Sequence, residues 1–292
     1  MTDQNRNRLT AEPLLHETDL RTKAGLFFVF SPEMDIFAAV MSKHWYICLL
    51  AALAVCSGCA AKVKEYKVKI VKEYEHDTSS YTQGLFFYKG EMYESTGLYG
   101  SSSFRKVELE TGKALEKLKF NRKYFAEGSV ELGGKIYVLT WESKVAFVYD
   151  AETLTFVQSY SYPREGWGLT TDGKQLIASD GSSRLFFMDA DYRFIKSIDV
   201  RLNGRPVRYL NELEYIDGKI WANVYMTDIV VIINPETGVV EATVDCTGLL
   251  PDSLRKVDTD VLNGIAYNPD TKKLYLTGKK WCRLYEVELV SK

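Results

Sequence analysis

Five segments between Tyr81 and Lys279 repeat one short pattern. Each begins with a polar or aromatic residue, then has Gly or Glu and an aliphatic or small residue, and continues through a turn into a short strand. The five copies open at Gln83-Gly84-Leu85, Glu127-Gly128-Ser129, Trp167-Gly168-Leu169, Asn211-Glu212-Leu213 and Asn263-Gly264-Ile265. Their turns, at positions 90, 134, 173, 218 and 272, are 44, 39, 45 and 54 residues apart. A period of roughly 40 to 50 residues made of short strands is typical of propeller blades, so we expect an all-β, five-bladed β-propeller.

The composition agrees with a single β-rich domain over residues 62–292. The chain has 19 Tyr, 14 Phe and 5 Trp but only 7 Pro, and runs such as Ile229–Ile233 are rich in strand-forming residues. Its 37 Lys and Arg are balanced by 39 Asp and Glu, which gives a net charge of −2. Because nucleic-acid binding normally needs a basic surface, we expect no nucleic-acid partner.

The N-terminal segment has the features of an export signal. Lys43-His44 precede an apolar run of 11 residues, Trp45–Val55, which is the size of a secretory core and too short to span a membrane. Small residues before Cys59 resemble a bacterial lipoprotein signal, so residues 41–59 are interpreted as the signal and Cys59 as the lipidated residue. Cys56 is the weaker choice for lipidation. An ordinary secretory signal or an uncleaved anchor is the alternative.

The 40 residues before this signal do not fit it. A signal peptide normally begins close to its basic region, so we expect residues 1–40 to be a mis-assigned start, with translation beginning at Met41, or a disordered extension. Export would place the domain in the periplasm or cell envelope, attached to the membrane only through its lipid. In that oxidising space Cys246 and Cys282 could form a disulfide, but free thiols fit the sequence equally well.

The repeats predict two rings of equivalent residues at the channel of the propeller. The first residues of the copies form one ring: Gln83, Glu127, Trp167, Asn211 and Asn263. The residues seven positions after each turn form the other: Gly97, Trp141, Asp180, Tyr225 and Lys279. Neither ring is apolar, as a purely structural position would be. The rings therefore predict a binding site, unless their polar members only hydrate a water-filled tunnel.

Two carboxylates in this pattern are candidates for chemistry. Glu127 follows the aromatic pair Tyr124-Phe125, and several members of the two rings of equivalent residues are aromatic. Desolvation in such surroundings would raise the pKa of Glu127 toward the range useful for proton transfer. Glu94 occupies a position at which the other four repeats have apolar residues. Burial of an unpaired carboxylate is costly, so either a Lys or Arg neutralises Glu94 or it faces the amine of a ligand.

The sequence argues against a metal centre. His76 is the only histidine after the signal, which excludes a three-histidine site, and we interpret it as a surface residue. No phosphate-binding loop or nucleotide motif is present. We expect neither a metal nor another cofactor.

Several motifs together resemble the plant and bacterial type of glutaminyl-peptide cyclotransferase. They are Tyr81-Thr82-Gln83-Gly84-Leu85, Tyr93-Glu94-Ser95-Thr96-Gly97-Leu98-Tyr99-Gly100, Phe125-Ala126-Glu127-Gly128, Trp167-Gly168-Leu169, Leu210-Asn211-Glu212-Leu213-Glu214, Trp221-Ala222-Asn223 and Leu262-Asn263-Gly264-Ile265. The resemblance covers about residues 66 to 290. It implies a five-bladed β-propeller that converts the N-terminal Gln of peptides or proteins to pyroglutamate, releases ammonia, and has its site at one mouth of the channel.

The resemblance also implies the site residues. They are Gln83, Glu94, Glu127, Trp141, Trp167, Asn211 and Lys279, to which ring positions add Tyr225 and Asn263. Tyr81 stands where the family usually has Phe, and Tyr225 stands where some members have Trp. Both differences keep an aromatic side chain in the wall of the expected site.

From these residues we derive a metal-independent reaction in a protein expected to be a monomer. Glu127 would shuttle a proton from the attacking amine to the departing nitrogen, while Glu94 would bind the amine, although the sequence leaves exchange of these two roles open. Trp141 and Trp167 would favour the neutral amine. Two other functions remain open: a non-catalytic extracytoplasmic propeller that binds peptides or proteins, and a lactonase or lyase on the same fold.

Overall fold

The computed structural model describes residues 62–292, in which the regular secondary structure is almost entirely β-strand. The one regular helical element in this range is a single 3-10 turn, η1 (Asp252–Leu254). None of the described elements is a helix with the length and apolar character needed to cross a membrane. The residues interpreted as extension and signal, 1–40 and 41–59 with Cys59, lie outside the described part of the chain.

Most strands form meandering antiparallel sheets of four. One sheet contains β2 (Thr82–Tyr88), β3 (Glu91–Thr96), β4 (Ser103–Val107) and β5 (Ala114–Lys119). The next contains β6 (Ala126–Leu132), β7 (Lys135–Thr140), β8 (Val145–Asp150) and β9 (Phe156–Ser161). The third contains β10 (Leu169–Thr171), β11 (Leu176–Ser179), β12 (Arg184–Met188) and β13 (Phe194–Asp199). A small hairpin, β14 (Arg201–Leu202) with β15 (Arg205–Pro206), follows.

The remaining strands form one eight-stranded sheet with two halves. One half contains β16 (Leu210–Ile216), β17 (Lys219–Val224), β18 (Ile229–Ile233) and β19 (Val240–Asp245). The other contains β20 (Leu262–Asn268), β21 (Lys273–Gly278), β22 (Arg283–Ser291) and the first strand of the domain, β1 (Lys64–Glu75). β1 pairs antiparallel with β22 and parallel with β19, so the start of the domain is tied to its end.

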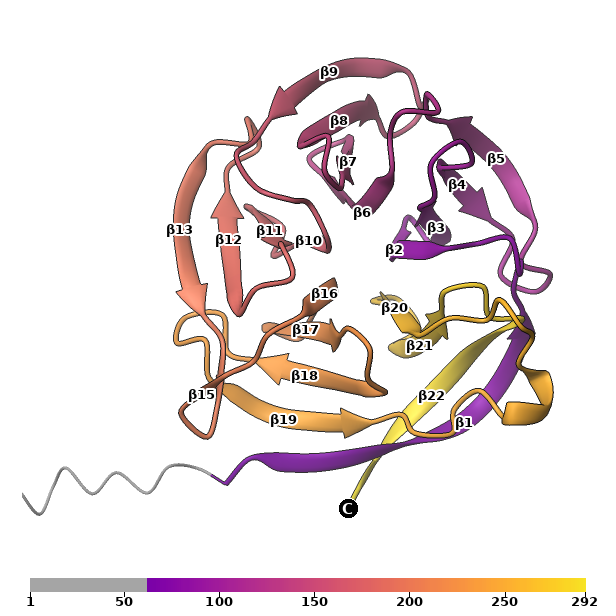
Figure 1. The fold of residues 1–292 in the computed structure, drawn as a ribbon, viewed down its shortest axis with the longest axis vertical. Coiled ribbons are helices and arrows are strands. Elements are labelled where there is room, and N and C mark those ends of the chain that lie inside the picture. Colours follow the sequence, from indigo (N-terminus) through magenta and orange to yellow (C-terminus); the bar gives the residue numbers. More distant parts are fainter. Residues whose placement is uncertain (1–61) are drawn as a thin grey trace, which may run out of the picture. The chain divides into compact units, whose positions relative to one another are not determined.

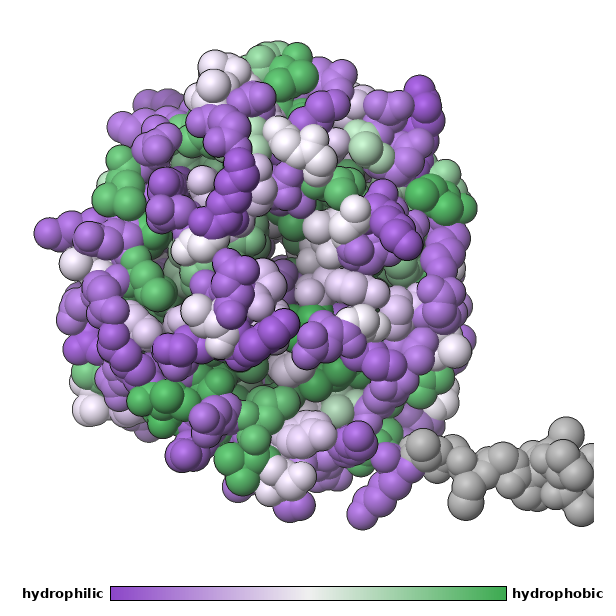
Figure 2. All heavy atoms as spheres, turned by 180° about the vertical axis from the view of Figure 1, so that it is seen from behind, coloured by the Kyte–Doolittle hydropathy of each residue, from purple (hydrophilic) through white to green (hydrophobic). Residues whose placement is uncertain are grey.

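The sheets are arranged around a central space, with β2, β6, β10, β16 and β20 nearest the centre (Figure 1). Buried apolar side chains fill the layers between neighbouring sheets, as Tyr137, Leu169 and Leu176 do in one layer. Seen from the opposite side, hydrophilic and hydrophobic residues are mixed over the surface around a narrow central opening (Figure 2). The fold is therefore an all-β, propeller-like ring.

The turn of each repeat lies where the sequence predicts it. Gly90, Gly134, Gly173 and Gly218 have φ between 77° and 84°, and Lys272 takes the same left-handed conformation with φ 60°. These residues join the first and second strands of each group. The turns at Gly90, Gly134 and Gly218 have two residues, and such hairpin turns favour positive φ at this position, whereas the turns at Gly173 and Lys272 have four. Glycine therefore recurs at four of the five turns because it adopts this conformation without steric cost.

The repeated motif itself forms a β-bulge on the innermost strand. The pairing register shifts between Thr82 and Gly84 in β2, and at the equivalent places in β6, β16 and β20. A bulge re-aims one side chain, and in these four strands it lies at the first residue of the motif. The third motif has no such shift, since Trp167 precedes β10. A Cβ added to Gly168 would lie 2.0 Å from the carbonyl oxygen of Asn211, so inner strands of neighbouring sheets approach closely at this point.

In the fourth copy of the motif Glu212 replaces this glycine. Its carboxylate accepts hydrogen bonds from the backbone N–H groups of Leu85 at 3.3 Å and Ile265 at 2.9 Å. These donors belong to β2 and β20, which are the innermost strands of their sheets. Glu212 therefore links three inner strands across the channel.

Candidate active site

A small cavity of about 200 Å³ opens at one mouth of the channel. It is lined by Tyr81, Gln83, Phe125, Glu127, Trp141, Trp167, Asn211, Tyr225 and Lys279. Sites for drug-sized ligands are usually about 300 to 1,000 Å³, so this cavity suits a single side chain. It brings together seven of the nine substrate-site and catalytic residues expected from the sequence; Glu94 and Asn263 do not line it.

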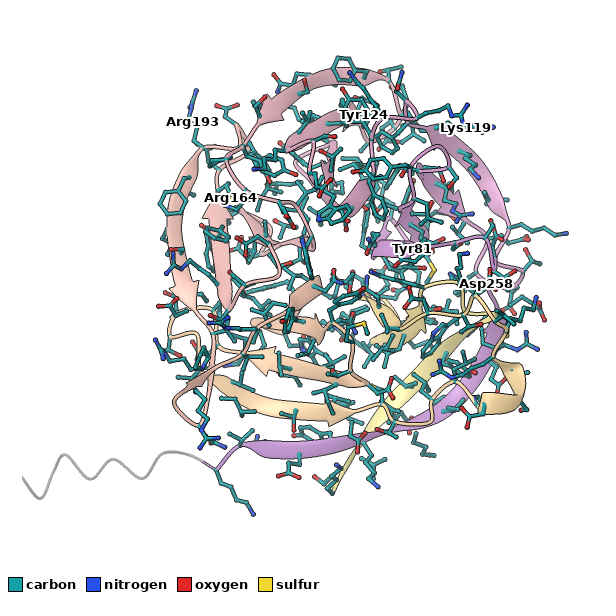
Figure 3. All side chains as sticks on the ribbon, in the orientation of Figure 1. Tyr81, Lys119, Tyr124, Arg164, Arg193 and Asp258 are labelled. Carbon is teal, nitrogen blue, oxygen red and sulfur yellow. The ribbon has the colours of Figure 1, made fainter. Side chains whose placement is uncertain are left out.

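The two rings of the repeat explain why these residues meet. Four residues of the first ring stand at the bulges of inner strands, and Trp167 precedes β10 by two positions. Trp141, Tyr225 and Lys279 of the second ring directly follow β7, β17 and β21. The backbone N–H of Trp141 donates to the carbonyl of Phe125 at 3.0 Å, and that of Tyr225 donates equivalently to Tyr209 at 2.9 Å. Each second-ring residue is thus fixed beside the start of its own inner strand. Tyr81, which precedes β2, lies close to the centre of the ring (Figure 3).

Two members of the second ring do not reach the cavity. Gly97 leaves room for Phe125, since a Cβ at Gly97 would lie 2.2 Å from the Phe125 ring. The Asp180 carboxylate accepts the backbone N–H of Ser182 at 3.0 Å in its own turn. Both positions therefore support local structure.

Aromatic side chains form the walls of the cavity. Phe125 meets Trp141 and Tyr81 edge to face, with ring centroids 5.6 and 6.0 Å apart. On the other side Trp167 and Tyr225 meet at 86° with centroids 5.6 Å apart. Such edge-to-face contacts restrict the planes of the rings, and they make the cavity an apolar enclosure with few polar groups.

Glu127 is the carboxyl group of this enclosure, and it is 5% exposed. Burial raises the pKa of Glu127 well above its usual range; the positive charge of Lys279 opposes this rise and the negative charge of Glu165 adds to it. Among the described residues, no hydrogen bond to the carboxylate offsets the rise. A carboxyl group that gains and loses a proton near neutral pH can act as both base and acid.

Lys279 is the cationic group of the cavity and is also buried. Its Nζ lies over the rings of Tyr81 and Tyr225, 4.8 and 4.7 Å from their centroids. Burial lowers the pKa of Lys279, although the negative charges of Glu127 and Asp260 oppose that change. Cation–π contacts of this kind hold the ammonium in place and leave its N–H groups able to donate to a bound ligand.

The amide side chains present one fixed donor group and one free acceptor. The Oε1 of Gln83 accepts the Nδ2 of Asn263 at 3.2 Å, and that Nδ2 also donates to the Thr82 carbonyl at 2.9 Å. Asn263 therefore lies behind Gln83 and turns the Gln83 NH₂ group away from itself. The Oδ1 of Asn211 is buried without a hydrogen-bond partner among the described residues. An unpaired buried acceptor at a cavity wall is a binding feature for an N–H donor.

Glu94 lies outside the cavity, in a cluster of buried charges. Its carboxylate is 3.2 Å from Nε of Arg105 and 3.1 Å from Nε2 of His76, and it accepts the Thr82 hydroxyl at 2.7 Å. Burial alone would raise the pKa of Glu94, but Arg105 and His76 lower it to about 2. Of the two alternatives for Glu94, neutralisation by an Arg is therefore the arrangement found. The sequence pattern does not single out Arg105.

The interpretation of His76 as a surface residue is wrong. His76 is 8% exposed, and its Nδ1 is 2.9 Å from the carbonyl oxygen of Trp281, which comes from the other end of the domain. Burial lowers its pKa, but the charge and hydrogen bond of Glu94 outweigh burial and raise it above the usual value. No sequence pattern signals this burial, because the contact depends on closure of the ring.

We expect His76 to make the stability of the protein depend on pH. A raised pKa in the folded state contributes stability that is complete below the unfolded value of 6.5 and is lost as the pH rises through the folded value. His76→Gln retains a donor but does not titrate. Urea unfolding between about pH 5.5 and 8.5 should therefore give a difference in the free energy of unfolding between wild type and variant that is largest at low pH and decreases as the pH rises. A constant gap would contradict this role.

Glu165 is a further site residue that the sequence did not indicate. It lies in the connection between β9 and β10, and its carboxylate accepts the indole N–H groups of both Trp141 and Trp167. Nothing in the repeat marks this position, since the connection lies outside the aligned motifs.

Neither cysteine of the described domain is paired: Cys246 is buried and Cys282 is partly exposed, and both are free thiols. Within residues 62–292, no group of three or more His, Cys, Asp or Glu side chains is placed to hold a metal ion.

Comparison with known proteins identifies the family. Residues 44–289 match the family model described as glutamine cyclotransferase. The chain is 42% identical over 232 residues to a glutaminyl-peptide cyclotransferase of Arabidopsis thaliana, an alignment that covers 76% of this chain and 71% of that protein. Its fold is similar to the crystal structure of Myxococcus xanthus glutaminyl cyclase, with a TM-score of 0.74, 33% identity, and coverage of 79% of this chain and 100% of the other. Because the family model matches most of this chain, the chain belongs to the glutamine cyclotransferase family.

Proposed function

We propose that this protein is a glutaminyl-peptide cyclotransferase, which converts an N-terminal glutaminyl residue to pyroglutamate and releases ammonia. The family supports this proposal, and so do the names of the Arabidopsis and Myxococcus relatives. The observation that carries it is the buried Glu127 carboxyl group inside a small aromatic cavity of about 200 Å³. A site of this size and polarity suits one uncharged amide side chain and the amine beside it.

The reaction is an intramolecular acyl transfer. The α-amino nitrogen of the substrate attacks the carbonyl carbon of its own side-chain carboxamide, and a five-membered lactam forms. The new C–N bond replaces the bond to the carboxamide nitrogen, which leaves as ammonia after it receives a proton. Because nucleophile and electrophile belong to one residue, the protein mainly has to hold the side chain folded back and move one proton.

Glu127 is the residue that we assign to proton transfer. Its carboxylate accepts a proton from the attacking amine and passes it to the departing nitrogen, which cannot leave as an amide anion. The raised pKa of Glu127 makes its ionised form a stronger base than an ordinary carboxylate, and it makes the carboxyl group easier to reprotonate. The apolar walls of Trp141 and Trp167 lower the pKa of the substrate amine, because burial disfavours its charged form.

The polar groups of the cavity fit the rest of the substrate. Lys279 and the free NH₂ group of Gln83 donate to the carboxamide oxygen, which becomes an oxyanion in the tetrahedral intermediate; one well-placed donor is worth about 3 to 4 kcal/mol in such a role. The unpaired Oδ1 of Asn211 accepts an N–H of the substrate. Asn263 positions Gln83, and Tyr225 holds Lys279.

We also infer that the ring has five blades. Three blades are the four-stranded sheets, and the halves of the eight-stranded sheet on either side of the β19–β1 pairing are the other two. Each of these five groups contains one copy of the repeated motif. On this interpretation β1 is the outer strand of the last blade, so the two ends of the domain close the ring within one blade.

An ammonia assay tests the proposed function. We expect a Gln-initiated dipeptide to yield equal amounts of ammonia and pyroglutamyl product, with no loss of activity in the presence of a chelator. Two matched substrates serve as controls: an N-acetylated Gln peptide has no nucleophilic amine, and an Asn-initiated dipeptide would have to form a strained four-membered ring. Binding of the peptide without ammonia release would favour the non-catalytic propeller, and loss of activity with chelator would favour a metal-dependent enzyme.

A further inference from the structure

Glu165 joins the two tryptophan walls of the cavity through a single oxygen atom. Its Oε2 accepts the indole N–H of Trp141 at 2.8 Å and that of Trp167 at 3.0 Å. Trp141 follows β7 in one sheet and Trp167 precedes β10 in the next. Hydrogen bonds to an ionised acceptor are roughly twice as strong as neutral ones, so this carboxylate is a firm link between two sheets at the site.

The hydrogen bonds fix what the ring contacts leave free. Trp141 packs edge to face on Phe125, and Trp167 lies on Gly181, where a Cβ would come within 2.6 Å of the indole. These contacts restrict the plane of each indole but do not by themselves decide which edge faces the cavity. Rotation of either indole by half a turn would remove its N–H from Glu165 and leave a polar group without its partner.

The main chain on both sides of Glu165 is itself held. A Cβ at Gly166 would lie 2.2 Å from the Tyr162 hydroxyl oxygen, and the Trp167 N–H donates to the Ser179 carbonyl at 3.1 Å. Arg164, on the other side, lies over the ring of Phe186 on β12, with its guanidinium carbon 3.9 Å from the ring centroid. The carboxylate is therefore presented from a fixed connection and not from a free loop.

We propose that Glu165 is a positioning residue of the cyclisation site, which holds the indoles of Trp141 and Trp167 in the orientation that folds the substrate side chain back on its own amine. This inference rests on the proposed function. Its physical reason is that an intramolecular reaction depends on near-contact geometry, and misplacement by about 1 Å costs roughly 10²-fold in rate. Glu165 touches the walls and not the reacting atoms.

The charge of Glu165 has a second, separable effect. It adds to the rise in the pKa of Glu127 that burial causes, while Lys279 opposes that rise. Because Glu127 accepts a proton in the proposed reaction, the rate should rise with pH as Glu127 ionises. Removal of the Glu165 charge should therefore move this limb of the kcat profile to lower pH.

Two substitutions separate hydrogen bonding from charge. Glu165→Ala removes both bonds and the charge, and we expect kcat to fall on the order of 10- to 100-fold with a smaller change in KM. Glu165→Gln keeps an amide oxygen with two lone pairs, which can still accept both N–H groups, so kcat should stay within about threefold of wild type. Both variants should show the shift of the pH limb. Equal losses in kcat for Ala and Gln would overturn the positioning role, and so would an Ala variant with wild-type kcat.

A matched control removes a neighbouring carboxylate that contacts no indole. Glu142, next to Trp141 in the sequence, is exposed and accepts only the Tyr99 hydroxyl, at 3.3 Å, among the described residues. We expect Glu142→Ala to leave kcat and KM unchanged. A loss similar to that of Glu165→Ala would mean that any negative charge at this rim serves the same purpose, which would overturn the specific role of Glu165.

Indole N–H resonances in a ¹⁵N-correlated NMR spectrum test the proposal independently of activity. In Glu165→Ala the resonances of Trp141 and Trp167 should move upfield and exchange faster with solvent, because their acceptor is gone. Trp281 is an internal control, since its indole N–H donates to the Asp260 carbonyl at 2.9 Å. Unchanged Trp141 and Trp167 resonances would overturn the proposal. If both resonances shift but the wild-type protein releases no ammonia, the hydrogen bonds of Glu165 to the two indoles are supported and the proposed function is refuted.

Discussion

Glu127→Gln should reduce turnover of a Gln-initiated dipeptide on the order of 10²-fold or more. Gln has nearly the shape of Glu and can form hydrogen bonds, but it cannot accept a proton from the attacking amine and return it to the departing nitrogen. The Glu127 carboxylate is buried and accepts no hydrogen bond that would offset its desolvation among the described residues. Replacement by an uncharged amide should therefore not lower the free energy of unfolding. The measurement is kcat between about pH 6 and 9 with thermal unfolding of both proteins.

The pH profile distinguishes proton transfer from a packing role. Wild type should lose activity at low pH as Glu127 becomes protonated, whereas the residual activity of Glu127→Gln should lack that limb. Lys279→Met is a second variant for comparison. Loss of the nearby positive charge should raise the pKa of Glu127 further, so the low-pH decrease in kcat should move to higher pH. Near-wild-type kcat in Glu127→Gln would exclude it as the proton shuttle.

Glu94→Gln should mainly destabilise the protein, by about 3 to 5 kcal/mol. The substitution removes the fully buried carboxylate that lies 3.2 Å from the Arg105 guanidinium, which keeps its ion pair with the partly exposed Asp77 at 2.7 Å, and it also removes the charged partner of His76. Removal of one member of a buried pair costs this much because the other charge stays desolvated. The sequence position alone predicts a different result, a rise in KM from loss of a partner for the substrate amine.

Urea unfolding and steady-state kinetics on the same preparation decide between these outcomes. We expect a lower free energy of unfolding and, per folded molecule, kcat and KM close to wild type, because Glu94 does not line the cavity. Glu142→Gln is a suitable control, since an exposed carboxylate should change stability by less than about 0.5 kcal/mol. Wild-type stability with a large rise in KM would restore Glu94 as a substrate-binding residue.

The repeated motif predicts much of the site from sequence alone. Bulge and turn are local features, so most copies of the motif place the first residue and the residue after the second strand in a similar way. Equivalent residues then meet at one mouth of the channel, which is why most members of the two rings line one cavity: Gln83, Glu127, Trp167 and Asn211 of the first ring, and Trp141, Tyr225 and Lys279 of the second. Local geometry repeated around an axis determines this convergence, and local geometry is what a sequence encodes most directly.

The partners of Glu94 needed more than the repeat. Arg105 is the direct cross-strand neighbour of Glu94 in the β3–β4 hairpin, so a register assigned to that hairpin would have found it. His76 approaches from the segment that precedes the first repeat and is fixed by Trp281, 205 residues further on. No local pattern contains that contact.

The sequence by itself therefore determined the all-β class, the turns of the repeat and which residue types surround the cavity. Only the tertiary structure decided which carboxylate is buried free and which is buried in an ion pair, and that Glu165 lies between two indoles from different sheets. The physical reason is that charge state depends on the solvent and partners around a group. Those are set by closure of the ring, which brings together segments that the sequence keeps far apart.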